Sequence, residues 1–526
     1  MSVKHLLILL SLIVNTSLQA QVKSAKEIDS KYLNWHNQDY TLNKVVGISL
    51  DKAYQQLLNG KKPQKQIIVA VIDGGVDINH EDLKENIWVN EDEIANNGID
   101  DDKNGYVDDI HGWNFLGNRK GENVNIETYE FIRIMRETPK DQQNTPVYLK
   151  AKQLYDKEMK SQMEQKESLE RFSSVYEKAK AIVMANSGID VHNADDLKKV
   201  KKSGDSQFIA ARKFLEQRYS IGFTEKILES LKDSNAKKLK YQLSLEFDPR
   251  KIVGDNPHDI TDTNYGNNDV AGPRADHGTA VAGVIAAIRN NNLGIDGIAT
   301  HVKIMVIRTT PDGDERDKDV ALGIRYAVEN GAHIINMSFG KDLSVEKKWV
   351  DESVRLAEQK GVLLVHAAGN DGVNIDVVEN YPSDRYLNGT EPANWIEVGA
   401  SGQKPDTKLP ASFSNYGQHV DLFAPGVNIA SLDTANHYNT HDGTSLAAPV
   451  VSGVAALLMS YYPELTTQQI IQVLLQSGTP YPKLKVYQPK EDGKPTKVRF
   501  NTLSKTASIL NAYQAIEMAE RMRSGK

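Results

Sequence analysis

Five short apolar runs, rich in β-branched residues, constrain the fold of this chain more than any other feature of its sequence. They occupy residues 66–72, 302–307, 333–337, 361–365 and 395–398. In the first run, every residue from Ile67 to Ile72 is apolar. A strand that is apolar at nearly every position is buried on both faces, as the strands of parallel sheets are.

Segments with helical spacing lie between these runs. Val320, Ile324, Ala327 and Val328 form one apolar stripe, and Val354, Leu356 and Ala357 form part of another. Alternating strands and helices predict an α/β fold, in which helices cover both faces of a parallel sheet. In such sheets, reactive side chains gather at the carboxyl ends of the strands.

Residues 118–251 have a different pattern, with few strand signals. Apolar residues spaced by three or four predict a long helix that ends near Gly188. Its stripe comprises Tyr155, Met159, Met163, Leu169, Phe172, Tyr176, Ala179 and Val183. Further helices are expected at residues 208–219 and 223–245. We therefore expect residues 118–251 to form a helical insertion, either an antiparallel hairpin or a small bundle.

Composition excludes several classes of function. The chain has 526 residues, of which 40% are apolar, and this is ample for a large core. Acidic and basic residues are interspersed and sum to a formal net charge of −7, so no nucleic-acid partner is expected. The absence of cysteine excludes a disulfide, a thiolate zinc site and a cysteine nucleophile.

The first 20 residues have the layout of a secretory signal peptide. Lys4 precedes an apolar run from Leu6 to Val14, and Ala20 ends the segment at a small residue, after which we expect cleavage. The alternative, a membrane anchor, is disfavoured because the run is too short to span a bilayer. We expect a mature chain without a membrane span, exported to the periplasm or the medium. Residues 21–64 form a polar N-terminal segment with weak helical patterning.

Three short motifs stand where secondary structure changes. In Val-Ile-Asp-Gly-Gly-Val-Asp (71–77), Asp73 ends a buried strand. His277 opens an apolar helix in Asp-His-Gly-Thr-Ala-Val-Ala-Gly (276–283). In residues 442–453, Ser445 begins another apolar helix after Asp-Gly-Thr. Each motif alone fits an ordinary turn or helix cap. Together they supply a hydroxyl nucleophile, a base to take its proton, and a carboxylate to orient that base.

These motifs, in the order Asp, His, Ser, resemble the signature blocks of the subtilase family of serine peptidases. The resemblance covers residues 65–117 and 252–478 and implies a subtilisin-like peptidase domain over 65–117 and 252–526. It implies that Asp73, His277 and Ser445 form a catalytic triad. In Val-His-Ala-Ala-Gly-Asn (365–370), it implies that Asn370 stabilises the oxyanion. The implied partners are protein or peptide substrates.

The resemblance also implies where a substrate binds. Ser338, Phe339 and Gly340 resemble the edge segment that pairs with an extended peptide. Ala368 and Gly369, with Ala367, are expected to line the pocket for the side chain that precedes the cut bond. The preferred cleavage residue, the natural substrate, the maturation route and the oligomeric state stay open.

The sequence departs from the family pattern in three places. Ala280 stands where members often have a second histidine, outside the triad. Residues 118–251 separate the Asp and His blocks, which usually lie much closer together. Residues 21–64 do not look like the folded prodomain that many subtilases carry.

An acidic loop at residues 98–109 predicts a structural calcium site. Oxygen-bearing side chains alternate before a glycine, as in calcium-binding loops. The candidate ligands are Asp100, Asp102, Asn104, the carbonyl group of Tyr106, and Asp108. The twelfth position is His111 and not glutamate, so the loop is not an EF-hand. The alternative is a solvated acidic turn.

Two other functional classes remain as alternatives to a peptidase. A non-catalytic subtilase-like binding protein would use the insertion as its partner surface, but a lost triad residue would favour that interpretation and none is lost. A metal-dependent hydrolase would need a compact His/Glu ligand motif, which the sequence lacks.

Overall fold

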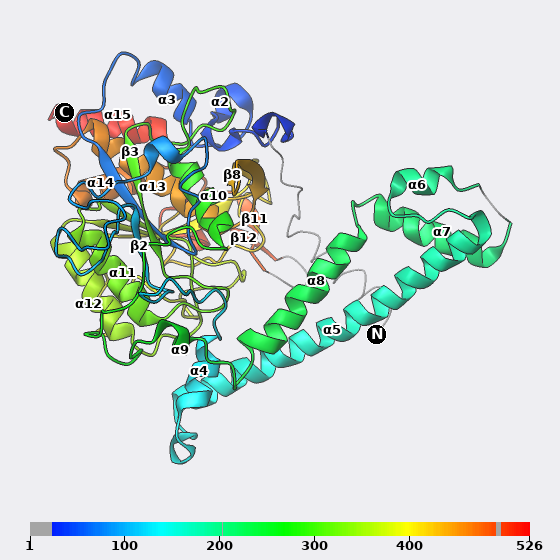
Figure 1. Cartoon of the computed structure of the whole chain (residues 1–526). Helices are drawn as coiled ribbons and strands as arrows, with labels where there is room; N and C mark the ends of the chain where they lie inside the picture. Colours follow the sequence, from blue (N-terminus) through cyan, green and yellow to red (C-terminus); the bar gives the residue numbers. More distant parts are fainter. Residues whose placement is uncertain (1–23, 202–203, 491–495, 526) are drawn as a thin grey trace. The chain divides into compact units, whose positions relative to one another are not determined.

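The structure, a computed structural model, describes residues 24–201, 204–490 and 496–525. The signal peptide expected at residues 1–20 lies outside the described residues. The described chain divides into two compact units, which we treat separately (Figure 1). The smaller unit is Phe131–Asp248, and the larger unit comprises the described residues on either side of it.

A nine-stranded sheet forms the centre of the larger unit, in the order β10-β13-β7-β6-β5-β4-β1-β3-β2. All neighbouring strands are parallel except β10 and β13. The five predicted strands are present as β1 (Ile67–Asp73), β3 (Val302–Arg308), β4 (Ile334–Met337), β5 (Leu363–Ala367) and β6 (Trp395–Ser401). The other four are β2 (Gly112–Asn114), β7 (Leu422–Pro425), β10 (Thr479–Pro480) and β13 (Ser508–Ile509).

Two antiparallel strand pairs lie outside this sheet. They are β8 (Ile429–Asp433) with β9 (His437–His441), and β11 (Lys485–Tyr487) with β12 (Lys497–Arg499). Strand β9 leads into the helix that carries Ser445, so this pair stands beside the predicted nucleophile.

Helices cover both faces of the sheet, as the alternating pattern predicts. On β1, Val69 and Val71 join a core that includes α10 (Ala275–Ala286) and α13 (Thr444–Tyr461). The alternate residues Ala70 and Ile72 join a second core with α11 (Asp317–Glu329) and α12 (Lys347–Gln359). The α/β fold class is therefore confirmed. The remaining helices of this unit are α2 (Tyr40–Asn43), α3 (Leu50–Gln56), α9 (Arg250–Val253), α14 (Thr467–Gln476) and α15 (Ala512–Arg523).

Helix α13 is apolar on every side. Among the described residues it is the one helix long and apolar enough to cross a membrane, and all of its residues are buried within the protein. Its composition therefore matches a central core helix.

Residues 24–64 pack as part of the larger unit. Trp35, Ile48 and Leu50 are fully buried in the same core as α13. The N–H group of Val46 donates to the carbonyl of Gln403, and that of Ala512 donates to the carbonyl of Ile48. The weak helical patterning of this segment corresponds to α3.

The smaller unit is helical, as predicted for the insertion. Its helices are α5 (Pro146–Ser187), α6 (Ala194–Lys199), α7 (Ser206–Tyr219) and α8 (Glu225–Lys237), and α4 (Glu130–Glu137) begins at its border. Helix α5 ends before Gly188, which is left-handed at φ +70°. Leu169, Phe172 and Tyr176 of its stripe pack with α7 and α8 in one core.

The borders of the smaller unit differ from the residues 118–251 expected for the insertion. Residues 118–130 and 249–251 belong to the larger unit. Ile126 pairs with Asp312 in a parallel bridge, and the guanidinium of Arg250 lies 2.6 Å from the Asp319 carboxylate. Single bridges and ion pairs leave no periodic pattern in a sequence. The sequence alone therefore does not separate residues 118–130 and 249–251 from the insertion.

Candidate active site

Asp73 and His277 form a close pair at the carboxyl end of the sheet. Asp73 is the last residue of β1 and is 3% exposed. His277 stands in the first turn of α10, with its Nδ1 atom 2.9 Å from each carboxylate oxygen of Asp73. A neutral imidazole that donates from Nδ1 has an unprotonated Nε2, which is the atom required of a general base.

A glycine allows this close approach of α10 to β1. A methyl group at Gly278 would lie 2.1 Å from the carbonyl oxygen of Gly75 and 3.2 Å from the Asp73 Cβ atom. Because the first distance is far below a van der Waals contact, any side chain at this position would force the helix away from the strand. The glycine after the histidine is therefore part of what brings Asp73 and His277 together.

Asp73 also favours the protonated form of His277. Burial alone would lower the pKa of His277, but the facing Asp73 carboxylate outweighs this effect and raises the pKa above its ordinary value. The imidazolium form, which appears when a base takes a proton, is stabilised by the same carboxylate.

Ser445 stands at the start of α13, which begins at Thr444. The first N–H groups of a helix have no partner within the helix, so the N–H group of Ser445 is available to a developing anion. The Oγ atom of Ser338 donates a 2.9 Å hydrogen bond to the carbonyl of Ser445, which ties the segment after β4 to this helix start.

The amide of Asn370 has a fixed orientation. Thr444 donates to its Oδ1 atom twice, from the main-chain N–H at 2.9 Å and from the hydroxyl at 3.0 Å. A main-chain N–H can only donate, so the atom that faces Thr444 is the oxygen. The NH₂ group of Asn370 is therefore turned away from Thr444 and remains a donor.

The nucleophile and both expected oxyanion donors meet beside Gly443. A methyl group at Gly443 would lie 2.8 Å from Ser445 Oγ, 3.6 Å from the Ser445 nitrogen and 3.8 Å from Asn370 Nδ2. Among the described residues, the side-chain partner of His277 is Asp73, and no hydrogen bond joins it to Ser445. Catalytic hydrogen bonds often tighten only when a substrate is bound.

The segments expected to bind substrate follow β4 and β5 and approach each other at Asn380. A methyl group at Gly340 would lie 2.7 Å from Asn380 Oδ1, and one at Gly369 would lie 3.4 Å from Asn380 Nδ2. Sequence analysis missed Asn380, because it stands in a loop that carries no strand or motif signal. Ala368 is fully buried and packs in the core, so its methyl group does not line an open surface.

The acidic loop brings two of its five expected ligands together. The carboxylates of Asp100 and Asp102 converge with that of Glu93, with one oxygen of each within 4.8 Å of the others. The Asp108 carboxylate instead accepts the N–H groups of Asn97 and Gly98. The side-chain oxygen of Asn104 accepts the N–H of Tyr106. The Tyr106 carbonyl stays a predicted ligand.

Glu93 is the member of this cluster that sequence analysis missed. It lies seven residues before Asp100, outside the alternating pattern, and is 8% exposed. Among the described residues, no lysine, arginine or histidine forms an ion pair with Glu93, Asp100 or Asp102. The donor set consists of hard oxygens, which suits calcium better than a transition metal.

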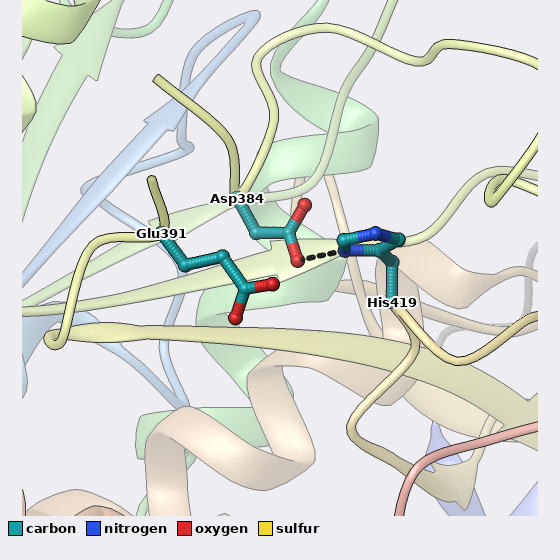
Figure 2. A group of neighbouring side chains, drawn as sticks. All are labelled: Asp384, Glu391 and His419. Carbon is teal, nitrogen blue, oxygen red and sulfur yellow. Dashed lines mark hydrogen bonds and ion pairs between the residues drawn. The ribbon is translucent and has the colours of Figure 1, made fainter. Parts of the chain in front are cut away.

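A second group of possible metal ligands comprises Asp384, Glu391 and His419 (Figure 2). The Nδ1 atom of His419 lies 2.7 Å from the Asp384 carboxylate, and Glu391 approaches the pair from a third segment (Figure 2). The imidazole–carboxylate bond accounts for this arrangement without an ion.

The chain is similar in sequence to known proteins. The sequence model of the subtilase family matches residues 64–500. A thermostable alkaline protease of Halalkalibacterium halodurans is 41% identical over 204 residues, which are 39% of this chain and 52% of that protein. A thermophilic serine proteinase of Bacillus sp. is 39% identical over 216 residues, 41% of this chain and 48% of that protein.

Subtilisin BL of Lederbergia lenta is 36% identical over 204 residues, which are 39% of this chain and 70% of that protein. The matched region spans about half the length of the first two relatives.

Proposed function

The chain belongs to the subtilase family, and we propose on this basis that it is a serine endopeptidase. The proposal rests on one observation: three atoms lie close together beside Gly443, namely Ser445 Oγ, the Ser445 nitrogen and Asn370 Nδ2. The 2.9 Å contact between His277 and Asp73 supplies the oriented base that such a nucleophile needs.

In this proposal, Ser445 attacks the carbonyl carbon of a peptide bond while His277 Nε2 takes the hydroxyl proton. The N–H of Ser445 and the NH₂ of Asn370 stabilise the negative oxygen that forms. His277 then gives its proton to the departing amine, which leaves an acyl group on Ser445. Water, activated by the same base, releases the acyl group. Asp73 stays ionised and stabilises the imidazolium.

Labelling with a fluorophosphonate probe tests the assignment of the nucleophile. We expect wild-type protein to be labelled and to degrade casein, and Ser445→Ala to lose both properties while it keeps its far-UV spectrum and melting temperature. A Ser452→Ala variant, which changes another buried serine of the same helix, serves as the control. Casein degradation by Ser445→Ala at the wild-type rate would refute the proposal and favour a non-catalytic binding role for this site.

We also propose that calcium stabilises the acidic loop. Glu93, Asp100 and Asp102 would hold the ion, because their convergent carboxylates repel one another unless a cation neutralises them. Calcium would act on folding stability and take no part in the cleavage step.

Export is the third part of the proposal. The basic, apolar and small-residue order of residues 1–20 supports a signal peptide that directs the chain out of the cytoplasm. Protein substrates of the periplasm or the medium would then be accessible to the enzyme.

A further inference from the structure

A buried histidine–glutamate pair, which the proposed mechanism does not use, contacts the segment expected to bind substrate. His366 of β5 and Glu397 of β6 are register partners in neighbouring strands. His366 Nδ1 lies 2.9 and 3.0 Å from the two carboxylate oxygens of Glu397. On its other side, His366 Nε2 lies 2.8 Å from the carbonyl oxygen of Phe339.

The direction of the bond to Phe339 follows from its acceptor. A carbonyl oxygen can only accept, so His366 Nε2 carries a hydrogen. One further proton lies between Nδ1 and Glu397, whether the pair is imidazolium with carboxylate or imidazole with carboxylic acid. In both forms His366 donates to Phe339, so this donor does not depend on where the shared proton resides.

Stability alone does not explain the pair. His366 is fully buried and Glu397 is 3% exposed, and the indole N–H of Trp395 donates to Glu397 at 2.8 Å. Taking two ionisable groups out of water is expensive, and an apolar pair of similar volume often stabilises a protein as well or better. The hydrogen bond from His366 to the Phe339 carbonyl therefore explains the buried pair better than a contribution to stability does.

The bond sets which main-chain groups of the segment face outward. In an extended segment, the N–H and C=O groups of one residue point to one edge, and those of the next residue point to the other. Phe339 directs its carbonyl to His366, and Lys341 exchanges two 2.9 Å hydrogen bonds with Tyr381. An extended conformation of this segment, which pairing with a peptide strand requires, directs the main-chain groups of Ser338 and Gly340 to the opposite edge.

We propose that the His366–Glu397 pair is a positioning device for the substrate-binding segment Ser338–Gly340. By holding the Phe339 carbonyl inward, it keeps the main-chain groups of Ser338 and Gly340 available to an extended peptide. This inference rests on the proposed peptidase function. It implies that the pair affects substrates long enough to form a strand and not those that place a single residue at Ser445.

The test compares two substrates that differ only in this respect. One is a tetrapeptide with a chromogenic leaving group, and the other is an N-blocked ester of its last residue alone. Because a single variant would strand a buried partner, the informative change is the double variant H366L/E397L. We expect the ratio of kcat/KM for the tetrapeptide to that for the ester to fall about tenfold, as loss of a hydrogen-bonded alignment predicts. Fluorophosphonate labelling of Ser445 should keep its wild-type rate.

Two further variants separate positioning from packing. H366Q/E397Q returns a neutral amide donor near the Phe339 carbonyl and should restore most of the lost ratio, whereas H366L/E397Q lacks that donor and should not. His419→Gln removes another imidazole–carboxylate pair, that with Asp384 (Figure 2), and should leave the ratio unchanged. If H366L/E397L does not fold, the comparison of H366Q/E397Q with H366L/E397Q still tests the inference.

Two results would overturn the inference. One is an unchanged ratio in H366L/E397L, which includes equal losses on both substrates. The other is no difference between the two E397Q variants. Failure of the underlying peptidase proposal would look different. In that case the wild-type protein would cleave neither substrate and would not react with the probe.

Discussion

At the scale of single residues, the candidate site depends on which atom of a side chain faces which neighbour. The two hydrogen bonds from Thr444 fix the Asn370 amide with its oxygen inward, so the donor is set before a substrate arrives. The Asp73 carboxylate does the same for His277 by accepting a hydrogen bond from its Nδ1–H group. Donors and bases that are already oriented need no reorganisation during the reaction, which is the main source of electrostatic catalysis.

Asn370→Ala should lower kcat by about 100- to 1000-fold, the usual effect of removing one oxyanion donor. KM should change little, because the contact strengthens only in the transition state. Steady-state kinetics on a chromogenic tetrapeptide measure both constants. Asn380→Ala is the matched control, since it removes an amide near the same site that faces Gly340 and Gly369. An unchanged kcat in Asn370→Ala would show that another group stabilises the oxyanion.

The pH dependence of kcat/KM should follow the titration of His277. The base must be neutral, and its pKa is raised above the ordinary 6.5, so activity should be lost at acidic pH and rise through a midpoint above 6.5. Asp73→Asn removes the main charge that raises this pKa, so the midpoint should move to lower pH. The rate itself should fall by about 10⁴-fold, because the imidazole loses its orienting carboxylate.

Asp276→Asn is the control for this pH profile. Asp276 also favours protonation of His277, but it is exposed and raises the pKa of His277 less than Asp73 does. Its loss should move the midpoint less and leave the plateau rate close to wild type. A profile whose midpoint is the same in wild type and in a weakly active Asp73→Asn would assign the titration to another group.

The sequence predicts these residues to different extents. Asp73, His277, Ser445 and Asn370 lie in strings that resemble the family blocks, so their positions were predictable. Glu93 lies in the same loop as its partners but outside their alternating pattern. Asn380 stands in a loop, and Gly340, which it approaches, is distant from it in sequence. No spacing rule reaches either residue. His366 carried a signal that was available, because it is a titratable side chain in an otherwise apolar strand.

At the scale of elements, the long apolar runs were predictable and the short or irregular strands were not. Strands β1, β3, β4, β5 and β6 are buried nearly throughout, so their sequences are almost continuously apolar. Strand β13 has two residues and β9 alternates between buried and half-buried positions. Such short or mixed segments are specified by their partners in the sheet more than by local pattern.

The acidic loop is the element whose stability should respond to calcium. Millimolar calcium should raise the melting temperature of the wild type, and a chelator should lower it, because an ion bound only by the native state adds to its stability. Asp102→Asn should weaken the calcium response, as measured by differential scanning fluorimetry. Glu91→Gln removes an exposed carboxylate outside the cluster and should respond as the wild type does. If chelator and Asp102→Asn both leave melting unchanged, the loop is a solvated acidic turn.

At the scale of the whole molecule, the question is what the smaller unit contributes. It has its own core of apolar residues from α5, α7, α8 and the segment between α7 and α8, and Phe172, Tyr176 and Phe223 form an aromatic cluster within it. The polypeptide enters it after Glu130 and leaves it before Pro249. Within the larger unit, Glu130 forms a 2.9 Å ion pair with Lys341, the residue that follows Gly340 of the expected substrate segment. The point from which the chain continues into the smaller unit, here called the root of the insertion, thus lies within the larger unit beside that segment.

Because the chain enters the smaller unit next to the expected substrate segment, we predict that this unit restricts or recruits protein substrates. It is not expected to be part of the catalytic machinery. The variant that tests this replaces Phe131–Asp248 with a short Gly/Ser linker. It retains Glu130 and Arg250, whose buried ion pairs with Lys341 and Asp319 lie entirely within the larger unit. The rate on a chromogenic tetrapeptide should persist, because the triad, Asn370 and the Ser338–Gly340 segment are unchanged. The rate or cleavage pattern on a folded protein should shift.

A matched control separates loss of the insertion from damage at its root. Lys341→Met breaks the ion pairs with Glu130 and Asp317 but keeps the smaller unit, so it reports how disturbance of the root affects cleavage of both substrates. One outcome is that the linker variant alters cleavage of the protein substrate alone, while Lys341→Met alters cleavage of both substrates. That outcome would show that the smaller unit selects substrates and that its root has a structural role. Wild-type behaviour of the linker variant on both substrates would rule out gating. A linker variant that does not fold would contradict the prediction in another way, because the insertion core would then stabilise the peptidase unit itself.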